Sequence, residues 1–145
     1  MTFLISACLL GTPCRYDGKS KEIPQTIRAI MRAHTLIPIC PEVLGGLPTP
    51  RPSAERQGDA VVNREGRDVT ENYLRGAHEA ARLARLYGAN GVILKERSPS
   101  CGTALIYDGS FGGRLIPGEG VTAEVLRRAG IAVYSDEGPL PDIKN

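Results

Sequence analysis

The sequence predicts an α/β fold, a three-layer Rossmann-like domain with a mostly parallel sheet of about four strands and small hairpin insertions. Four short apolar segments are typical of buried parallel strands, at residues 2–6, 35–39, 91–95 and 130–134. Three of these segments directly follow a helical pattern. Helices that alternate with strands, joined by right-handed crossovers, give a parallel sheet that is covered on both faces.

The first helical pattern begins at Pro24, a residue suited to the first position of a helix because its missing N–H is not needed there. Helical spacing of the residues that follow predicts one face formed by Ile27, Ile30, Met31 and His34.

The second helix is predicted to open at Thr70 as its N-cap and to carry an apolar stripe of Leu74, Ala77, Ala81 and Ala84. A third, shorter helix is predicted from a Thr122 cap to a stop at Gly130. Two hairpins are expected at residues 59–69 and 104–116, the second turning at Asp108-Gly109 or shortly after.

Length and composition favour a single domain over residues 1–145, of which 136–145 are expected to form a mobile tail. No stretch resembles a secretory leader or reaches the roughly 20 apolar residues of a membrane span, so we expect a soluble, cytoplasmic protein without a membrane partner. The chain has no Trp for base stacking, and we expect no nucleic-acid partner. The sequence makes no prediction of oligomeric state.

Three of the four cysteines follow predicted strands. Cys8 comes two residues after the first, Cys40 directly after the second, and Cys101 six residues beyond the third. Because ligands of open α/β sheets bind at the carboxyl edge of the strands, we expect these three thiols to converge there. In a reducing compartment such cysteines are metal ligands or reactive groups rather than disulfides.

The spacing of the cysteines argues against a structural zinc site. Structural zinc sites usually contain a pair of cysteines two to four residues apart, whereas the nearest pair here, Cys8 and Cys14, is six apart. Scattered thiolates can hold an iron–sulfur cluster, and three of them on a four-iron cluster leave one iron open as a Lewis acid. Cys14 would close that iron, but it lies within a loop rather than just beyond a strand, so we expect it not to be a ligand.

Positive charge accompanies the cysteines on the same loops, where it would favour thiolates or attract an anion. We predict a substrate-binding set of Arg15, Tyr16, Lys19, Arg51, Lys95 and Arg97. If two of the cations reach a phosphate, charge-assisted hydrogen bonds would favour a ligand that bears a phosphate over a neutral one.

Four segments together resemble the thiouracil desulfurase family: SACLLGTPCRYDG (6–18), CPEVLGGLPTPRPSAE (40–55), DVTENYLRGA (68–77) and LKERSPSCG (94–102). The resemblance implies an α/β fold that carries a 4Fe-4S cluster on three cysteines, with one open iron for the sulfur of a small thiolated pyrimidine. Related proteins with an added carboxyl-terminal domain are linked to thiouridine in RNA. This chain has no room for that domain, so we expect a free base or nucleotide as substrate.

Residue by residue, the resemblance places the cluster on Cys8, Cys40 and Cys101, the catalytic glutamate on Glu42, and the catalytic serine on Ser98 or Ser100. A carboxylate two residues from a cluster cysteine can activate water or move protons. The predicted activity is therefore a non-redox desulfuration of a thiolated uracil.

Two other functions remain open at this point. A cluster carrier or electron-transfer protein would need neither an adjacent carboxylate nor an open iron. A zinc-binding regulatory domain would contain no iron.

Overall fold

The computed structural model describes residues 1–142 of the 145-residue chain. The elements of the central domain are β1 (Thr2–Ser6), the 3₁₀ helix η1 (Ala7–Leu10), α1 (Gln25–Ala33), β2 (Thr35–Ile39), α2 (Pro41–Leu44), α3 (Thr70–Leu86), β5 (Gly91–Leu94), α4 (Val121–Arg128) and β8 (Val133–Ser135). Two inserted hairpins are formed by β3 (Ala54–Gln57) with β4 (Ala60–Asn63), and by β6 (Leu105–Tyr107) with β7 (Leu115–Pro117).

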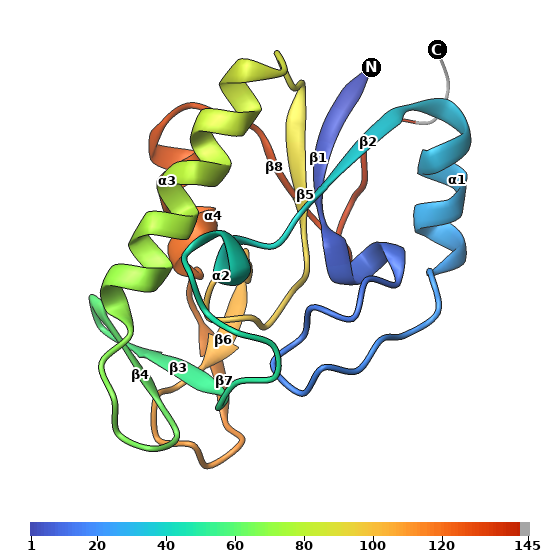
Figure 1. The fold of residues 1–145 in the computed structure, drawn as a ribbon. Coiled ribbons are helices and arrows are strands. Elements are labelled where there is room, and N and C mark those ends of the chain that lie inside the picture. Colours follow the sequence, from blue (N-terminus) through green and yellow to red (C-terminus); the bar gives the residue numbers. More distant parts are fainter. Residues whose placement is uncertain (143–145) are drawn as a thin grey trace.

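The central sheet within the described residues has the strand order β2-β1-β5-β8, and every neighbouring pair is parallel. Figure 1 shows α1 on one face of this sheet and α3 with α4 on the other. Both hairpins lie beyond the end at which β1 and β5 finish (Figure 1). The predicted fold class, a three-layer α/β domain with a mostly parallel sheet and hairpin insertions, is confirmed.

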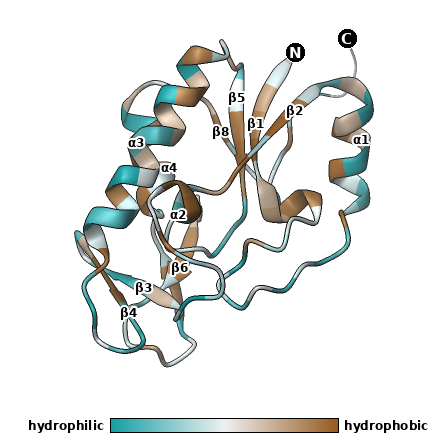
Figure 2. Ribbon diagram, in the orientation of Figure 1, coloured by the Kyte–Doolittle hydropathy of each residue, from teal (hydrophilic) through white to brown (hydrophobic). Residues whose placement is uncertain are grey.

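Burial on both faces explains why the central strands are continuously apolar, as their brown colour in Figure 2 shows. Leu4, Val92 and Leu94 pack against α3 and α4, whereas Phe3, Ile5 and Ile93 pack on the side of α1. From α1, Ile27 and Ile30 enter the second of these cores. Burial of each such side chain contributes about 1.5–3 kcal/mol to folding.

Several predicted element ends move in the structure. Pro24 caps α1 rather than opening it, and Met31 is exposed instead of facing the core. The last strand begins at Val133, later than predicted. The first hairpin lies earlier than predicted, because residues 54–57 pair with 60–63 and only an isolated bridge, Val62 to Asp68, joins the following segment.

Both predicted threonine caps are wrong. Thr70 lies inside α3 after the cap residue Val69, and its hydroxyl accepts a hydrogen bond from the Val61 N–H. Thr122 lies inside α4, fully buried, because Gly120 takes the cap position. In both cases contact with another segment, rather than capping, occupies the hydroxyl.

The predicted tail contacts the domain as far as it is described. Leu140 packs beside the core on the α1 side, and the Asp142 carbonyl lies 2.7 Å from Nε2 of the buried His34. Residues 143–145 lie outside the described part of the chain.

Candidate functional site

The three predicted ligand cysteines follow adjacent strands of the sheet. Ser6 is paired in register with Ile39, so β1 and β2 finish side by side, and Cys8 and Cys40 follow directly. Cys101 lies on the segment that leaves β5, which is the other neighbour of β1. The parallel sheet therefore brings chain segments 93 residues apart in sequence, from Cys8 to Cys101, to one edge.

The segment that carries Cys101 is a tightly bonded turn. The Ser98 hydroxyl oxygen accepts hydrogen bonds from the N–H groups of Ser100 and Cys101, both at 3.1 Å. The Ser100 hydroxyl is fully buried and lies 2.8 Å from that of Thr122. Of the two serines, Ser98 is the one that is partly accessible, and its own hydroxyl hydrogen has no acceptor among the described residues.

This turn is docked on the beginning of α4. The N–H groups of Gly120, Val121 and Thr122 donate to carbonyls of the Pro99–Gly102 segment at 2.7–2.9 Å. A Cβ at position 120 would lie 2.4 Å from the Ser100 carbonyl carbon, so only glycine permits this close approach.

The Cys101 thiol is buried, and burial raises its pKa to about 12 although hydrogen bonding by Ser6 and Ser100 acts in the opposite direction. Ser6 ends β1, so this contact ties the third cysteine to the strand that precedes Cys8. The pKa values of the Cys40 and Cys14 thiols are also raised. For Cys40 the largest cause is contact with the Cys14 thiol, followed by burial.

Cys14 lies closer to the other thiols than its place in a loop suggested. Hydrogen bonding with Cys40 lowers its pKa, but contact with Cys8 and burial outweigh this, and the net shift is upward. The Cys40 Sγ also lies 3.9 Å from the Cys14 carbonyl oxygen. Cys14 therefore contacts two of the three predicted ligands.

The chemistry of the donor set suits an iron–sulfur cluster, because Cys8, Cys40 and Cys101 are soft donors on separate segments at one edge of the sheet. Within residues 1–142, no three His, Cys, Asp or Glu side chains are already gathered as a ready metal site. The raised pKa values of Cys14, Cys40 and Cys101 favour their protonated thiols, so loading of a metal on Cys40 and Cys101 would require proton release.

Glu42 lies in the first turn of α2, two residues after Cys40. The Tyr73 hydroxyl donates a short hydrogen bond to Glu42 Oε1, and the Arg51 guanidinium lies 3.5 Å from Oε2. Burial and the adjacent carboxylate raise the pKa of Tyr73, which keeps the phenol protonated as a donor. The carboxylate is thus held from both sides.

Arg51 points inward. Its guanidinium donates to the carbonyls of Pro48 and Cys14 at 3.1 and 2.9 Å, and its side chain is only 3% exposed. It therefore links the Glu42 carboxylate to the loop that carries Cys14. Of the other predicted cations, Arg15 lies 3.8 Å from Asp17, whose side chain also accepts the backbone N–H of Lys19.

Lys95 and Arg97 form ion pairs with the segment after β8. The Lys95 ammonium lies 3.5 Å from Asp136 and 3.8 Å from Glu137, and Arg97 lies 2.9 Å from Glu137. Tyr16 is 47% exposed. Of the predicted substrate-binding set, Tyr16, Lys19 and Arg97 are exposed, and the three arginines and Lys95 lie beside carboxylates.

The position of α2, and with it Cys40 and Glu42, depends on a close contact with α3. A Cβ added at Gly76 would lie 1.8 Å from the Pro41 carbonyl oxygen. At this crossing the two helices meet backbone to backbone, which fixes α2 against a long and rigid element.

Comparison with known proteins decides the family. The family model described as 2-thiouracil desulfurase matches residues 3–138, nearly the whole chain. The chain belongs to the 2-thiouracil desulfurase family. A solved structure of a [4Fe-4S]-dependent thiouracil desulfidase, TudS, is 49% identical, with a TM-score of 0.88 over 94% of this chain and 91% of that one. The uncharacterized protein YbbK of Bacillus subtilis (strain 168) is 43% identical over 97% of this chain and 98% of its own length.

Sequence reasoning about this desulfurase-family chain missed Tyr73 and Glu96. Tyr73 is four residues from Ala77 on α3, a spacing that indicates an ordinary core position. Glu96 lies between two cations in KERSP, which is typical of exposed charge, yet it is only 5% exposed. Only the folded chain brings each of them to its partners.

A cavity of about 220 Å³ in the desulfurase-family domain lies beside this network rather than over the thiols. Arg51 and Tyr73 line it, together with residues of the 46–54 loop and the start of α3, but no cysteine does. The cavity therefore does not include the predicted cluster ligands.

Within residues 1–142, no helix combines the length and the hydropathy that crossing a membrane requires.

Proposed function

We propose that this protein is an iron–sulfur-dependent desulfurase that replaces the thiocarbonyl sulfur of a thiolated uracil with oxygen. The observation that carries the proposal is the arrangement of Cys8, Cys40 and Cys101 on segments that leave three adjacent parallel strands, with Glu42 beside the second. The family match and the likeness to a [4Fe-4S]-dependent thiouracil desulfidase support it.

In this proposal Cys8, Cys40 and Cys101 hold a 4Fe-4S cluster and leave one iron open. When bound, the cluster supplies a Lewis acid suited to a soft thiocarbonyl sulfur. Its three ligands come from β1, β2 and β5, so the cluster would lie at the carboxyl edge of the sheet.

The reaction balances without electron transfer. Water adds its oxygen to the ring carbon, the carbon–sulfur bond breaks, and the products are the uracil and hydrogen sulfide. The two protons of water end on the sulfide, so the chain must move protons but supply no electrons.

Glu42 is proposed to accept the proton of the attacking water. Its carboxylate is held by Tyr73 and Arg51, which orients it without consuming both lone pairs of each oxygen. Ser98 is proposed as the catalytic serine that hydrogen-bonds the substrate ring, because its hydroxyl is partly accessible, whereas Ser100 is buried against Thr122.

For the substrate we propose the neutral base rather than its nucleotide. The sequence favoured a phosphate because five cations share the site loops. In the structure Arg51 binds inward and Arg15, Lys95 and Arg97 already face carboxylates. A phosphate would have to compete with these groups, so the gain in kcat/KM from a phosphate is expected to be small.

A four-thiolate cluster carrier is the alternative that one observation favours, because Cys14 contacts both Cys8 and Cys40. A cluster closed by Cys14 would have no open iron and would serve electron transfer.

Anaerobic reconstitution with iron and sulfide, followed by a sulfide-release assay on 2- and 4-thiouracil, their nucleosides and their 5′-monophosphates, tests the proposal. We expect release of sulfide with formation of uracil, and kcat/KM for the base within about threefold of the monophosphate. A stable cluster with no sulfide release from any of these compounds would support the carrier instead.

A further inference from the structure

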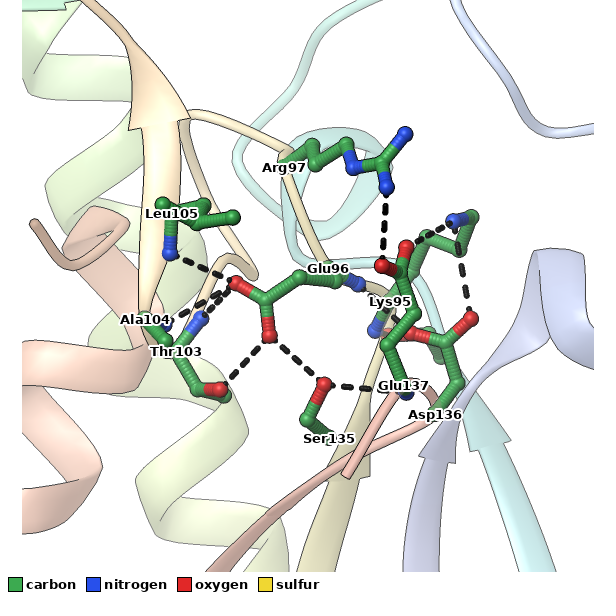
Figure 3. A network of polar contacts seen from close by, with 10 residues as sticks. Lys95, Glu96, Arg97, Thr103, Ala104, Leu105, Ser135, Asp136 and Glu137 are labelled. Atoms are coloured by element: carbon green, nitrogen blue, oxygen red, sulfur yellow. Dashed lines mark hydrogen bonds and ion pairs between the residues drawn. The ribbon is translucent and has the colours of Figure 1, made fainter. Parts of the chain in front are cut away.

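Glu96, directly after β5, is a buried carboxylate with an unusually complete set of donors. Its Oε1 accepts the consecutive backbone N–H groups of Thr103, Ala104 and Leu105 at 2.8–3.0 Å. Its Oε2 accepts the hydroxyl groups of Thr103 and Ser135 at 2.7 and 2.6 Å. Figure 3 shows the carboxylate between these two groups of donors.

The carboxylate is ionised at neutral pH. Burial acts to raise its pKa, but the hydrogen bonds from Ala104, Leu105, Ser135 and Thr103 outweigh burial and lower the pKa to about 2. Removal of this side chain would leave three partly buried backbone N–H groups without their acceptor.

These hydrogen bonds close the segment that contains Cys101. The segment begins at Arg97, whose φ of 71° lies in the left-handed region that a non-glycine residue rarely adopts. It ends at Leu105, the first residue of β6. Glu96 therefore ties the end of β5 to the start of β6, and Cys101 lies in the loop so closed.

The segment after β8 also holds Glu96 and Arg97 in place. The Glu96 N–H donates to Asp136 Oδ1 at 2.7 Å, and the Arg97 guanidinium pairs with Glu137. As Figure 3 shows, the strained residue and its neighbour are thus held from the segment after β8. A strained backbone conformation such as that of Arg97 persists only where several surrounding contacts hold it in place.

We propose that Glu96 is a positioning residue for Cys101: its carboxylate fixes the 97–105 segment so that the thiol stands where the cluster needs a ligand. This inference rests on the proposed function, because it assumes that Cys101 is a cluster ligand. Groups that orient metal ligands typically contribute about 10- to 100-fold to metal retention.

The chain contains a matched control for a merely structural role. Glu55 on β3 is also buried, and its Oε1 accepts the N–H groups of Gly109 and Phe111 at 3.0 Å. Phe111, like Arg97, has a positive φ, here 60°. Glu55 thus holds a strained loop too, but that loop carries no cysteine.

The experiment compares the wild-type protein, Glu96→Gln and Glu55→Gln after anaerobic reconstitution. The readouts are iron and sulfide per chain, the electron paramagnetic resonance spectrum of the reduced cluster, and the rate of iron loss to a chelator at a temperature well below every unfolding midpoint. We expect Glu96→Gln to lose iron about tenfold faster and to show an altered spectrum, with Glu55→Gln like the wild type.

Equal rates and spectra for the two variants would overturn the positioning role. If Glu96→Gln does not fold, Ser135→Ala decides, since it removes one donor from Glu96 Oε2 and leaves the backbone donors in place. We then expect iron loss at least twofold faster than in the wild type, and an unchanged rate contradicts the inference. Failure of the wild-type protein to hold a cluster would instead reject the proposed function.

Discussion

The Tyr73 hydroxyl donates its hydrogen bond to the carboxylate of Glu42, although the two residues are 31 positions apart. They meet because α2 lies across α3 at Gly76, one turn beyond Tyr73. The acid–base group of the proposed reaction is therefore aimed by a core residue of the longest helix among the described residues.

We expect Glu42→Gln to keep the cluster and to lower kcat roughly 10²- to 10⁴-fold, the usual contribution of a general base. The amide keeps the size of the side chain but cannot accept a proton from water. Cluster content and steady-state sulfide release are measured side by side, with the exposed Glu22→Gln as control. More than about half of the wild-type rate in Glu42→Gln would remove this carboxylate from the mechanism.

Tyr73→Phe should lower kcat about tenfold, equivalent to about 1.4 kcal/mol of transition-state stabilisation, and leave KM nearly unchanged. Phenylalanine fills the same space, but Glu42 Oε1 loses its donor and only Arg51 still holds the carboxylate. The free energy of unfolding should fall by about 1 kcal/mol. Tyr87→Phe, an exposed tyrosine at the end of α3, is the control, and an unchanged kcat at full cluster content contradicts the proposed orientation.

Serine at Cys8, Cys40 or Cys101 should abolish cluster assembly, whereas Cys14→Ser should assemble a full cluster. This is the sharpest test of the ligand set, because Cys14 contacts Cys8 and Cys40 in the structure. Iron and sulfide per chain after anaerobic reconstitution give the answer. A Cys14→Ser protein without iron, next to a Cys101→Ser protein with a full complement, would replace Cys101 by Cys14 as the third ligand.

Gly76→Ala should destabilise the fold by about 1–3 kcal/mol and also reduce cluster content and turnover. The added methyl group would lie 1.8 Å from the Pro41 carbonyl oxygen, so α2 must shift together with Cys40 and Glu42. Gly58→Ala is the control: nothing lies within 4 Å of its Cβ, and only its φ of 63° is strained. Chemical denaturation and iron content are measured for both, and a fully active Gly76→Ala protein would show that this contact does not position the site.

Glu96 predicts a pH dependence of stability. Its folded pKa of about 2 lies below its ordinary value, so its contribution is complete above about pH 4.5 and is lost as the pH falls toward 2. The difference in free energy of unfolding between the wild type and Glu96→Gln should therefore be largest near neutral pH and shrink on acidification. Urea denaturation of the metal-free proteins at pH 6, 4.5 and 3 measures it, and a difference that is constant over this range would show that folding does not lower the pKa of Glu96.

The segments at 2–6 and 91–95 were predictable as strands because β1 and β5 are buried along nearly their whole length. The edge strand β2 is only partly buried, but its apolar residues at 36, 37 and 39 still gave the pattern of a strand. The helix caps were not predictable. A threonine before a helical pattern indicates a cap, but the sequence does not show whether its hydroxyl is bonded to another segment, as it is for Thr70 and Thr122. The hairpin at 54–63 was misplaced because its strands are short and only partly apolar.

For the candidate site, the cysteines and Glu42 could be named from the sequence because they recur in family segments at strand ends. The residues that hold these groups in place could not be named from the sequence. Tyr73 has the spacing of a core residue and Glu96 the setting of a surface charge. Tyr73 meets Glu42 only through the fold, and Glu96 is buried because the chain turns back on it at residues 103–105 and β8 brings Ser135 to it. The sequence likewise gives no sign that Asp136 and Glu137 face Lys95 and Arg97.

The pairing of Lys95 and Arg97 with Asp136 and Glu137 affects the rate at which a ligand associates. Two cations and two carboxylates balance on the side of the site formed by β5 and β8, so this rim projects little net field into the solvent. Attraction over long distances accelerates encounter only where one sign of charge dominates. The association rate constant for an anionic ligand should therefore stay close to that for a neutral one, and raising the ionic strength should change neither by much.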